Sequence, residues 1–194
     1  DSILKKTERL TDEEFKIIQS HTTQGAKILE NLVSFPKAKE KALNLLEYRA
    51  HSRKELYDKL KRVTSAEIAA EVIAVLADGG LLDDETYAYQ YAHDAMELKN
   101  LGPARIKREL AQRGIDDDTA ENAIWAAERE TGSFEEHLDA LLAVKYKNCL
   151  SDEKNRAKTV NSLFRMGYEY GMIKIAISKV KEDILDEWNG NEGE

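Results

Sequence analysis

The chain has 194 residues, of which 29 are lysine or arginine and 37 are aspartate or glutamate, so its formal charge at pH 7 is −8. A net negative charge argues against a simple nucleic-acid binder, because such proteins are usually basic. The single cysteine excludes an internal disulfide framework and favours a reducing compartment, so we expect a cytoplasmic protein. No apolar run approaches the about 18 residues that a membrane span needs, and no strand-like alternation is present. The composition therefore predicts an all-α protein with no membrane partner.

Residues 1–35 predict a short helical segment in front of the rest of the fold. Thr11 and Glu14 have the spacing of a capping box. The stretch “LTDEEFKIIQSHTTQGAKIL” within residues 1–34 resembles a fragment of an HD-GYP phosphodiesterase domain, a family in which the histidine corresponding to His21 is a metal ligand. Because a two-metal site needs several converging ligands and the other signatures are absent, we expect His21 to bind no metal.

Three basic stretches recur along the remaining chain. Residues 49–62 contain six basic and two acidic residues, residues 99–113 contain five and one, and residues 145–165 contain six and two. The stretches begin about 50 residues apart, which is a period typical of helical repeat units.

The apolar pattern repeats with the same period. Leu56 and Leu60 align with Ile106 and Leu110, and Leu163 aligns with Leu110. In each copy a pair of amphipathic helices follows a further apolar helix, which in the third copy is expected at 134–148. We therefore predict three tandem three-helix repeats in an elongated arrangement, at residues 36–83, 84–132 and 133–185, followed by an acidic tail at 186–194.

Capping and turn residues predict where the helices end. Asp118 stands three residues before a glutamate, which is the spacing of a capping box, and Thr64 and Ser65 are alternative caps for the last helix of the first repeat. Gly102-Pro103 predicts the end of one helix and the start of the next. Pro36 predicts that a helix stops near the start of the first repeat.

The helical wheel places basic side chains opposite the core positions in each copy. In the third copy, Val160, Leu163 and Phe164 set the core side. One interpretation is a solvated face tied by local ion pairs such as Asp58 with Arg62, each contributing about 0.3–0.5 kcal/mol. The other is a binding face, because basic residues that only solvate a helix have no reason to recur at matching positions of three repeats. The candidate binding residues are Lys54, Lys61, Arg62, Arg105, Lys107, Arg108, Lys154, Lys158 and Arg165.

Three strings in the repeat region are specific: “ALNLLEYRAHSRKELYDKL”, “GLLDDETYAYQYAHDAMELKNLGPARIKRELAQRGI” and, more weakly, “SLFRMGYEY”. In order and spacing, residues 38–183 resemble RecX, the family of bacterial regulators of the RecA recombinase. The sequence departs from the pattern in two places. The turn at 61–64 lacks the glycine of the other copies, and Thr159 stands where Leu56 and Ile106 stand.

The resemblance implies three tandem three-helix repeats and a non-enzymatic protein. It implies binding to the RecA filament on single-stranded DNA, in the helical groove, with suppression of strand exchange, ATP turnover and coprotease activity. We expect a monomer. Two alternatives stay open: a helical module that binds DNA directly, and a metal-dependent cyclic-dinucleotide phosphodiesterase fragment suggested by residues 1–34 alone.

The sequence contains no recognisable catalytic motif. A Gly-rich phosphate loop, a G-x-S-x-G elbow and a Cys/His cluster are all missing, so we expect no catalytic residue, no metal site and no cofactor. His51, His93 and His137 are interpreted as isolated histidines on separate helices, and Cys149 as an idle thiol. Seven aromatic residues are interpreted as core or inter-repeat packing: Tyr87, Tyr89, Tyr91, Trp125, Phe134, Tyr146 and Phe164.

Overall fold

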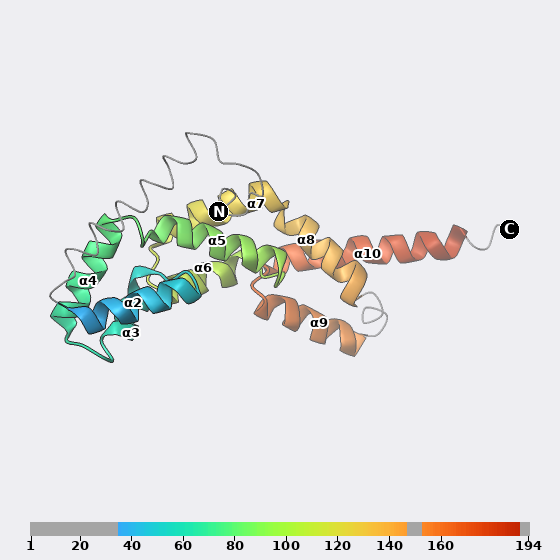
Figure 1. Cartoon of the computed structure of the whole chain (residues 1–194). Coiled ribbons are helices and arrows are strands. Elements are labelled where there is room, and N and C mark those ends of the chain that lie inside the picture. The colour runs from blue at the N-terminus through green and yellow to red at the C-terminus, as the bar shows by residue number, and fades with distance from the viewer. Residues whose placement is uncertain (1–34, 147–152, 191–194) are drawn as a thin grey trace, which may run out of the picture. The chain divides into compact units, whose positions relative to one another are not determined.

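The structure, a computed structural model, describes residues 35–146 and 153–190 (Figure 1). These residues form α-helices and one π-helical turn, with no β-strand among them, which confirms the predicted all-α fold for this part of the chain. The chain divides into two compact units between Asp83 and Asp84. The predicted helical segment at 1–34, which includes His21, lies outside the described residues, as does Cys149.

The first unit consists of three helices, α2 (Pro36–Tyr48), α3 (Arg53–Leu60) and α4 (Ala66–Asp78). Helix α2 begins at Pro36, because the first turn of a helix has no partner for the N–H that proline lacks. The predicted end of a preceding helix lies outside the described residues. Of the two candidate caps for α4, Ser65 is the one used, and its hydroxyl accepts a hydrogen bond from the Ile68 amide at 3.3 Å. The buried core consists of Ala38, Ala42, Leu56, Leu60, Ala69, Val72, Leu76 and Leu82.

The second unit holds two further helix triplets. The first is α5 (Asp84–Glu97), α6 (Pro103–Gln112) and α7 (Asp117–Thr131), and the second is α8 (Phe134–Leu141), α9 (Glu153–Arg165) and α10 (Tyr170–Gly190). A single core joins them, because buried residues of both triplets belong to one contact cluster. The positions predicted to be apolar fill this core, among them Ile106, Leu110, Ala120, Ile124, Leu163, Ile173 and Ile177.

The helix boundaries of the second unit differ from the predicted ones at three points. The helix expected at 134–148 ends as an α-helix at Leu141, and a π-helical turn, η1 (Leu142–Tyr146), follows it. The last helix continues to Gly190, so residues 186–190 belong to α10 rather than to a separate acidic tail. Asp116 caps α7 in place of Asp118, because its carboxylate accepts a hydrogen bond from the Thr119 amide at 2.9 Å.

Two aromatic residues are not packed as predicted. Trp125 is 59% exposed and Phe164 is 63% exposed, whereas the other five aromatic residues are buried or half-buried. In α9 the core-facing positions are Thr159 and Leu163, which places Phe164 on the outer side of the helix. Side chains at adjacent positions of a helix point about 100° apart, so burial of Leu163 does not require burial of Phe164.

A backbone contact locks the start of α6 to the end of α9. The Gly102 amide donates a hydrogen bond to the Met166 carbonyl at 2.8 Å, and the Ala104 amide donates one to the Gly167 carbonyl at 3.2 Å. A methyl group on Gly102 would lie 2.4 Å from the carbonyl carbon of Gly167, and one on Gly167 would lie 2.4 Å from the Cβ of Arg105. Gly167 also has a φ of +97°, which side-chain-bearing residues rarely adopt. Only glycine fits at either position.

Candidate functional site

The nine candidate basic residues lie on the middle helix of each triplet or at its end. None of them is buried, and only Arg105 and Lys107 are partly covered. The three helices differ in what neutralises these charges.

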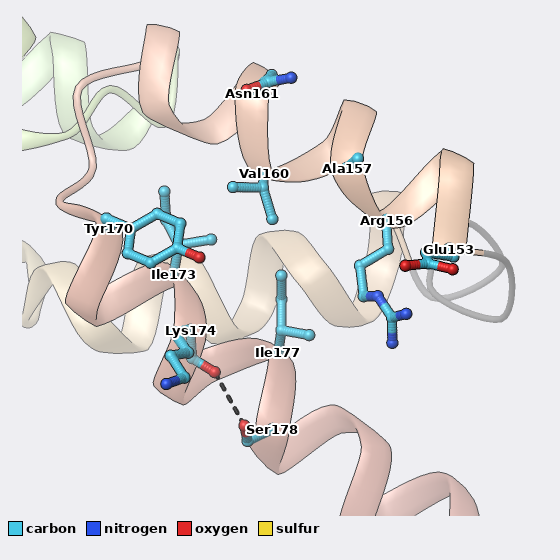
Figure 2. Close-up of a pocket in the computed structure, with 10 residues that line it drawn as sticks. All are labelled: Glu153, Arg156, Ala157, Val160, Asn161, Tyr170, Ile173, Lys174, Ile177 and Ser178. Carbon is cyan, nitrogen blue, oxygen red and sulfur yellow. Dashed lines mark hydrogen bonds between the residues drawn. The ribbon is translucent and has the colours of Figure 1, made fainter.

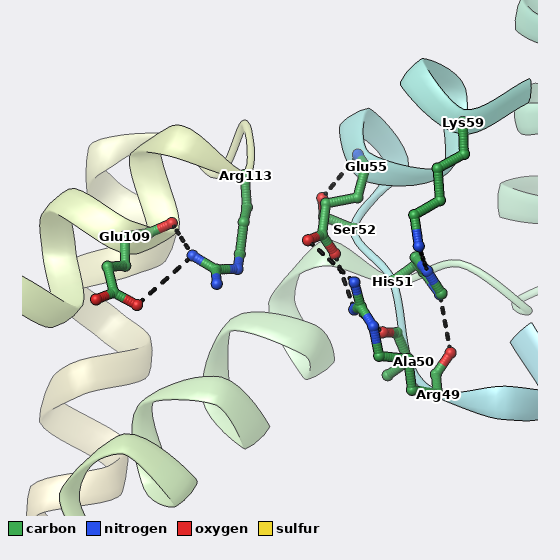
Figure 3. Close-up of polar contacts among 8 residues, drawn as sticks. All are labelled: Arg49, Ala50, His51, Ser52, Glu55, Lys59, Glu109 and Arg113. Carbon is green, nitrogen blue, oxygen red and sulfur yellow. Dashed lines mark hydrogen bonds and ion pairs between the residues drawn. The ribbon is translucent and has the colours of Figure 1, made fainter. Parts of the chain in front are cut away.

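On and around α3, local contacts hold some of the basic residues. The Arg49 guanidinium donates to both carboxylate oxygens of Glu55, at 3.1 and 3.3 Å (Figure 3). The Lys61 ammonium lies 5.4 Å from the centre of the Tyr57 ring. The predicted pair between Asp58 and Arg62 does not form, and Arg62 makes no ion pair within the described part of the chain.

His51 is a buried histidine in front of α3, rather than a residue on a helix. Its Nδ1 lies 2.9 Å from the Arg49 carbonyl oxygen and its Nε2 lies 2.7 Å from the Lys59 ammonium (Figure 3). A carbonyl can only accept, so Nδ1 carries the proton and Nε2 accepts from Lys59. Burial, together with the charges of Arg49 and Lys59, lowers the pKa of His51 despite the hydrogen bond to the carbonyl. The neutral ring therefore helps to fix Lys59.

On α6, one carboxylate organises the surrounding basic side chains. Glu109 accepts a hydrogen bond from Arg105 Nε at 2.8 Å and another from the Tyr91 hydroxyl. The Arg113 guanidinium lies 3.8 Å from the same carboxylate, donates to the Glu109 carbonyl at 2.6 Å (Figure 3) and lies 4.3 Å from the centre of the Tyr91 ring. Partial burial opposes ionisation of Glu109, but the hydrogen bonds from Tyr91 and Arg105 and the arginine charges together lower its pKa. Burial and the bond to Glu109 raise the pKa of Tyr91 to about 12.

Lys107 is also neutralised on the other side of α6. Its ammonium lies 2.6 Å from a Glu121 carboxylate oxygen and 3.4 Å from an Asp117 oxygen, both on α7. The hydrogen bond to Glu121 raises the pKa of Lys107. Arg108 is exposed and makes no ion pair with any described residue. Of the three candidates on α6, only Arg108 therefore keeps an uncompensated charge.

On α9, two of the candidate basic residues have no ion pair with a described residue. Lys154, Lys158 and Arg165 are exposed. Neither Lys158 nor Arg165 forms an ion pair with a described residue. Phe164 lies beside them, and a shallow depression in the surface is lined by Lys158, Asn161, Phe164 and Arg165.

The glycine contact between α6 and α9 places Arg105 beside the end of α9. An Arg105 Nη1 donates to the Arg165 carbonyl at 3.5 Å. The Tyr168 hydroxyl, deep in the core, donates to the Asn100 carbonyl at 3.2 Å, and burial raises the pKa of Tyr168 to about 12. Arg105 of the second repeat and Arg165 of the third, both predicted binding residues, thus lie close together at the end of α9.

An apolar groove lies on the other side of α9, facing α10. Figure 2 shows Val160 pointing from α9 toward Ile173 and Ile177, while Arg156 and Lys174 stand at the rim. Asn161 lines both this groove and the depression beside Phe164, so it marks the edge between the two surfaces.

The described residues offer no metal-binding cluster. No group of three or more His, Cys, Asp or Glu side chains lies together within residues 35–146 and 153–180. His93 is on α5 and His137 is on α8, where its Nε2 donates to the Thr131 carbonyl at 3.0 Å. None of the described helices is long and apolar enough to cross a membrane.

Two residues that hold basic side chains in place, Glu109 and Tyr91, are not among the predicted site residues. Glu109 was counted only as a charge against the basic stretch, although its i−4 and i+4 spacing to Arg105 and Arg113 is the signal of a local ion-pair network. The partner Tyr91 comes from another helix, and no spacing rule could have identified it.

Comparison with known proteins gives a consistent set of relatives. Residues 38–76 match the model of the first three-helix domain of RecX, and residues 83–124 match the model of the second. The chain is similar to the regulatory protein RecX of Finegoldia magna, with 33% identity over 153 residues that cover 75% of this chain and 73% of that protein. It is also similar to the regulatory protein RecX of Bacillus subtilis, with 34% identity over 73% of this chain. It spans 54% of the Bacillus protein's length.

A solved structure agrees with this assignment. The crystal structure of RecX from Lactobacillus salivarius superposes with a TM-score of 0.61 and 31% identity, covering 75% of this chain and 96% of that one. These comparisons give no support to the predicted resemblance of residues 1–34 to an HD-GYP fragment, because both family models match downstream of residue 37.

Proposed function

The chain belongs to the RecX family, and from this premise we propose that it regulates the RecA recombinase by binding the RecA filament on single-stranded DNA. Binding inhibits the recombinase, ATPase and coprotease activities of the filament. The chain acts in the cytoplasm, as a monomer, and without a catalytic step of its own.

The family assignment is the observation that carries this proposal. The matched relatives are named regulatory proteins, and both family models describe three-helix domains of RecX. The repeated basic helices support the proposal independently, because a filament containing nucleic acid is a polyanion. A chain with net charge −8 can still approach it if its positive side chains share one surface.

We propose that the three repeats, at 36–83, 84–132 and 133–185, each present one basic helix to the filament. Weak contacts to successive protomers add up through effective concentration. The proposed contact set consists of nine basic residues on or directly after α3, α6 and α9, none of which is buried: Lys54, Lys61, Arg62, Arg105, Lys107, Arg108, Lys154, Lys158 and Arg165.

The test is the ATPase activity of RecA on single-stranded DNA, with this protein titrated in at substoichiometric ratios. The expected result is inhibition that saturates below one molecule per RecA protomer. An unchanged ATPase rate across the titration would contradict the proposal.

Three triple-alanine variants, one for each basic helix, then locate the contact. Replacement of Arg105, Lys107 and Arg108 on α6 is one of them, and inhibition that survives this change removes α6 from the interface. A matched control is Lys179→Ala, because Lys179 is bound to Asp139 at 2.8 Å and lies outside the proposed set.

A further inference from the structure

Two features of the outer face of α9 together point to one kind of ligand. Lys158 and Arg165 form no ion pair with a described residue, as is also true of Arg62 and Arg108, and beside them lies an exposed aromatic ring, Phe164. We propose that this face, formed by Lys158, Asn161, Phe164 and Arg165, binds single-stranded nucleic acid directly, with a base stacked on Phe164 and phosphates on Lys158 and Arg165. The inference rests on the proposed function only in taking the nucleic acid of the filament as the biological ligand.

The charges of Lys158 and Arg165 are available to a ligand. Residues 154–168 contain four basic residues and no acidic one. The nearest carboxylates in the sequence, Glu153 and Glu169, stand beyond the two ends of this stretch. Neither Lys158 nor Arg165 is in an ion pair with a described residue, so no ion pair to the described part of the chain has to break when a phosphate binds.

The exposed ring has no role in the fold. By the alignment of Leu60, Leu110 and Leu163, the position of Phe164 is held by Lys61 and Ala111 in the other two triplets, and both are exposed. The triplet therefore folds without an aromatic residue there. Exposing most of a phenylalanine to water is unfavourable, and an exposed ring beside cations is an arrangement that stacking sites for unpaired bases use.

The geometry of the face favours a single strand over a duplex. Lys158, Asn161 and Arg165 follow one another at i, i+3 and i+7, so they form one stripe about 10 Å long along the helix. Phe164 lies at the edge of this stripe and faces outward at 63% exposure. Its ring can meet the flat face of a base only where that base is not already stacked in a double helix. The Asn161 amide, which lines the same depression, can both donate to and accept from a base edge.

The experiment measures the affinity of the full chain for a fluorescein-labelled oligothymidylate by anisotropy at stepped KCl concentrations. Phe164→Leu keeps an apolar side chain but removes the ring, and it should weaken binding about tenfold. Phe164→Trp keeps a stacking surface and should bind at least as well as the parent. Lys158→Ala with Arg165→Ala should reduce the steepness of the salt dependence by about 1.4 in log–log slope, which corresponds to two phosphates.

Trp125→Leu provides the matched control. Trp125 is exposed to a similar degree, 59%, on α7, and its replacement should leave oligothymidylate binding unchanged. Circular dichroism melting of each variant checks that the fold is kept. We expect no loss of the fold in the Phe164 variants, because this side chain is mostly exposed.

The outcomes separate this inference from the proposed function. Equal binding by Phe164→Leu and the parent, or no binding by the parent at low salt, overturns the inference even if RecA is inhibited. Loss of RecA inhibition by Phe164→Leu with unchanged oligothymidylate binding also overturns it, because the face then contacts protein. Stacking-dependent binding without any effect on RecA supports this inference and contradicts the proposed function.

Discussion

The helices α6 and α9 occupy equivalent places in neighbouring triplets, yet they present their positive charge differently. On α6, Arg105 and Lys107 are bound by Glu109 and Glu121. On α9, Lys158 and Arg165 have no such partner within the described part of the chain. Basic residues at matching positions are therefore not equivalent binding residues. What decides their availability is the set of carboxylates that the tertiary structure brings to them, and this contrast can be tested in four ways.

The largest expected effect comes from separating the two helices. Gly167→Ala puts a methyl group where the Arg105 backbone lies and forces a side-chain-bearing residue into a φ of +97°. The free energy of unfolding should fall by about 3 kcal/mol or more. Urea denaturation measures this change.

Gly171→Ala is the matched control for that prediction. Gly171 lies in the first turn of α10 with nothing within 4 Å of an added methyl group, so its replacement should be neutral or stabilising by up to about 1 kcal/mol. Equal denaturation midpoints for the two variants would show that the α6–α9 contact is not close-packed.

Removing the organising carboxylate should make α6 less ordered. Glu109→Gln weakens the bonds to Arg105, Arg113 and Tyr91 at a position where the side chain is only 22% exposed. We expect a loss of about 1–2 kcal/mol in the free energy of unfolding, because hydrogen bonds to charged groups are the stronger ones. Thermal and urea unfolding both report it. The same change at the exposed Glu97 should cost less than about 0.5 kcal/mol, and similar losses at both sites would contradict the network.

In the first unit a neutral histidine rather than a carboxylate contacts a cation, because His51 Nε2 accepts a hydrogen bond from Lys59. The pKa of His51 is lowered in the folded state, so the unfolded chain binds more protons as the pH falls. The stabilisation is complete above the unfolded pKa of about 6.5 and is lost as the pH falls from there through the lowered folded value. Between pH 7.5 and 5.5 the parent should lose up to about 1.4 kcal/mol more than His51→Gln. Parallel pH dependences of the two unfolding free energies would rule out this contribution.

The smallest effect is expected from a change that makes the charge on α6 more like that on α9. Glu121→Gln removes the 2.6 Å ion pair of Lys107 and leaves its 3.4 Å contact with Asp117. The weaker neutralisation of this cation should raise the affinity for oligothymidylate by at most about fivefold at 0.1 M salt, with little change in stability. Glu97→Gln changes the net charge equally, so an identical gain in that variant would attribute the effect to net charge rather than to Lys107.

Much of the fold could be predicted from the sequence, because helix formation and the apolar side of a helix depend on residues that are close together in the chain. Leucine and isoleucine at i and i+4 predicted the buried face of α3 and α6, and Leu56, Leu60, Ile106 and Leu110 are fully buried. On α9 the prediction holds for Leu163, but Phe164 is exposed. Gly102-Pro103 predicted the start of α6. The exact caps and ends were less certain, since neighbouring residues such as Asp116 and Asp118 have nearly equal capping ability.

The sequence by itself determined which residues form helices and which of their sides are apolar, because helix periodicity depends on spacing alone. Only the tertiary structure decided which charges are neutralised, because Lys107 meets Glu121 and Tyr91 meets Glu109 across separate helices. It also decided that Phe164 faces water and that two glycines, 65 positions apart in the chain, touch through their backbones. Such contacts depend on how helices pack, and helix packing is set by whole surfaces rather than by any one residue's neighbours in the sequence.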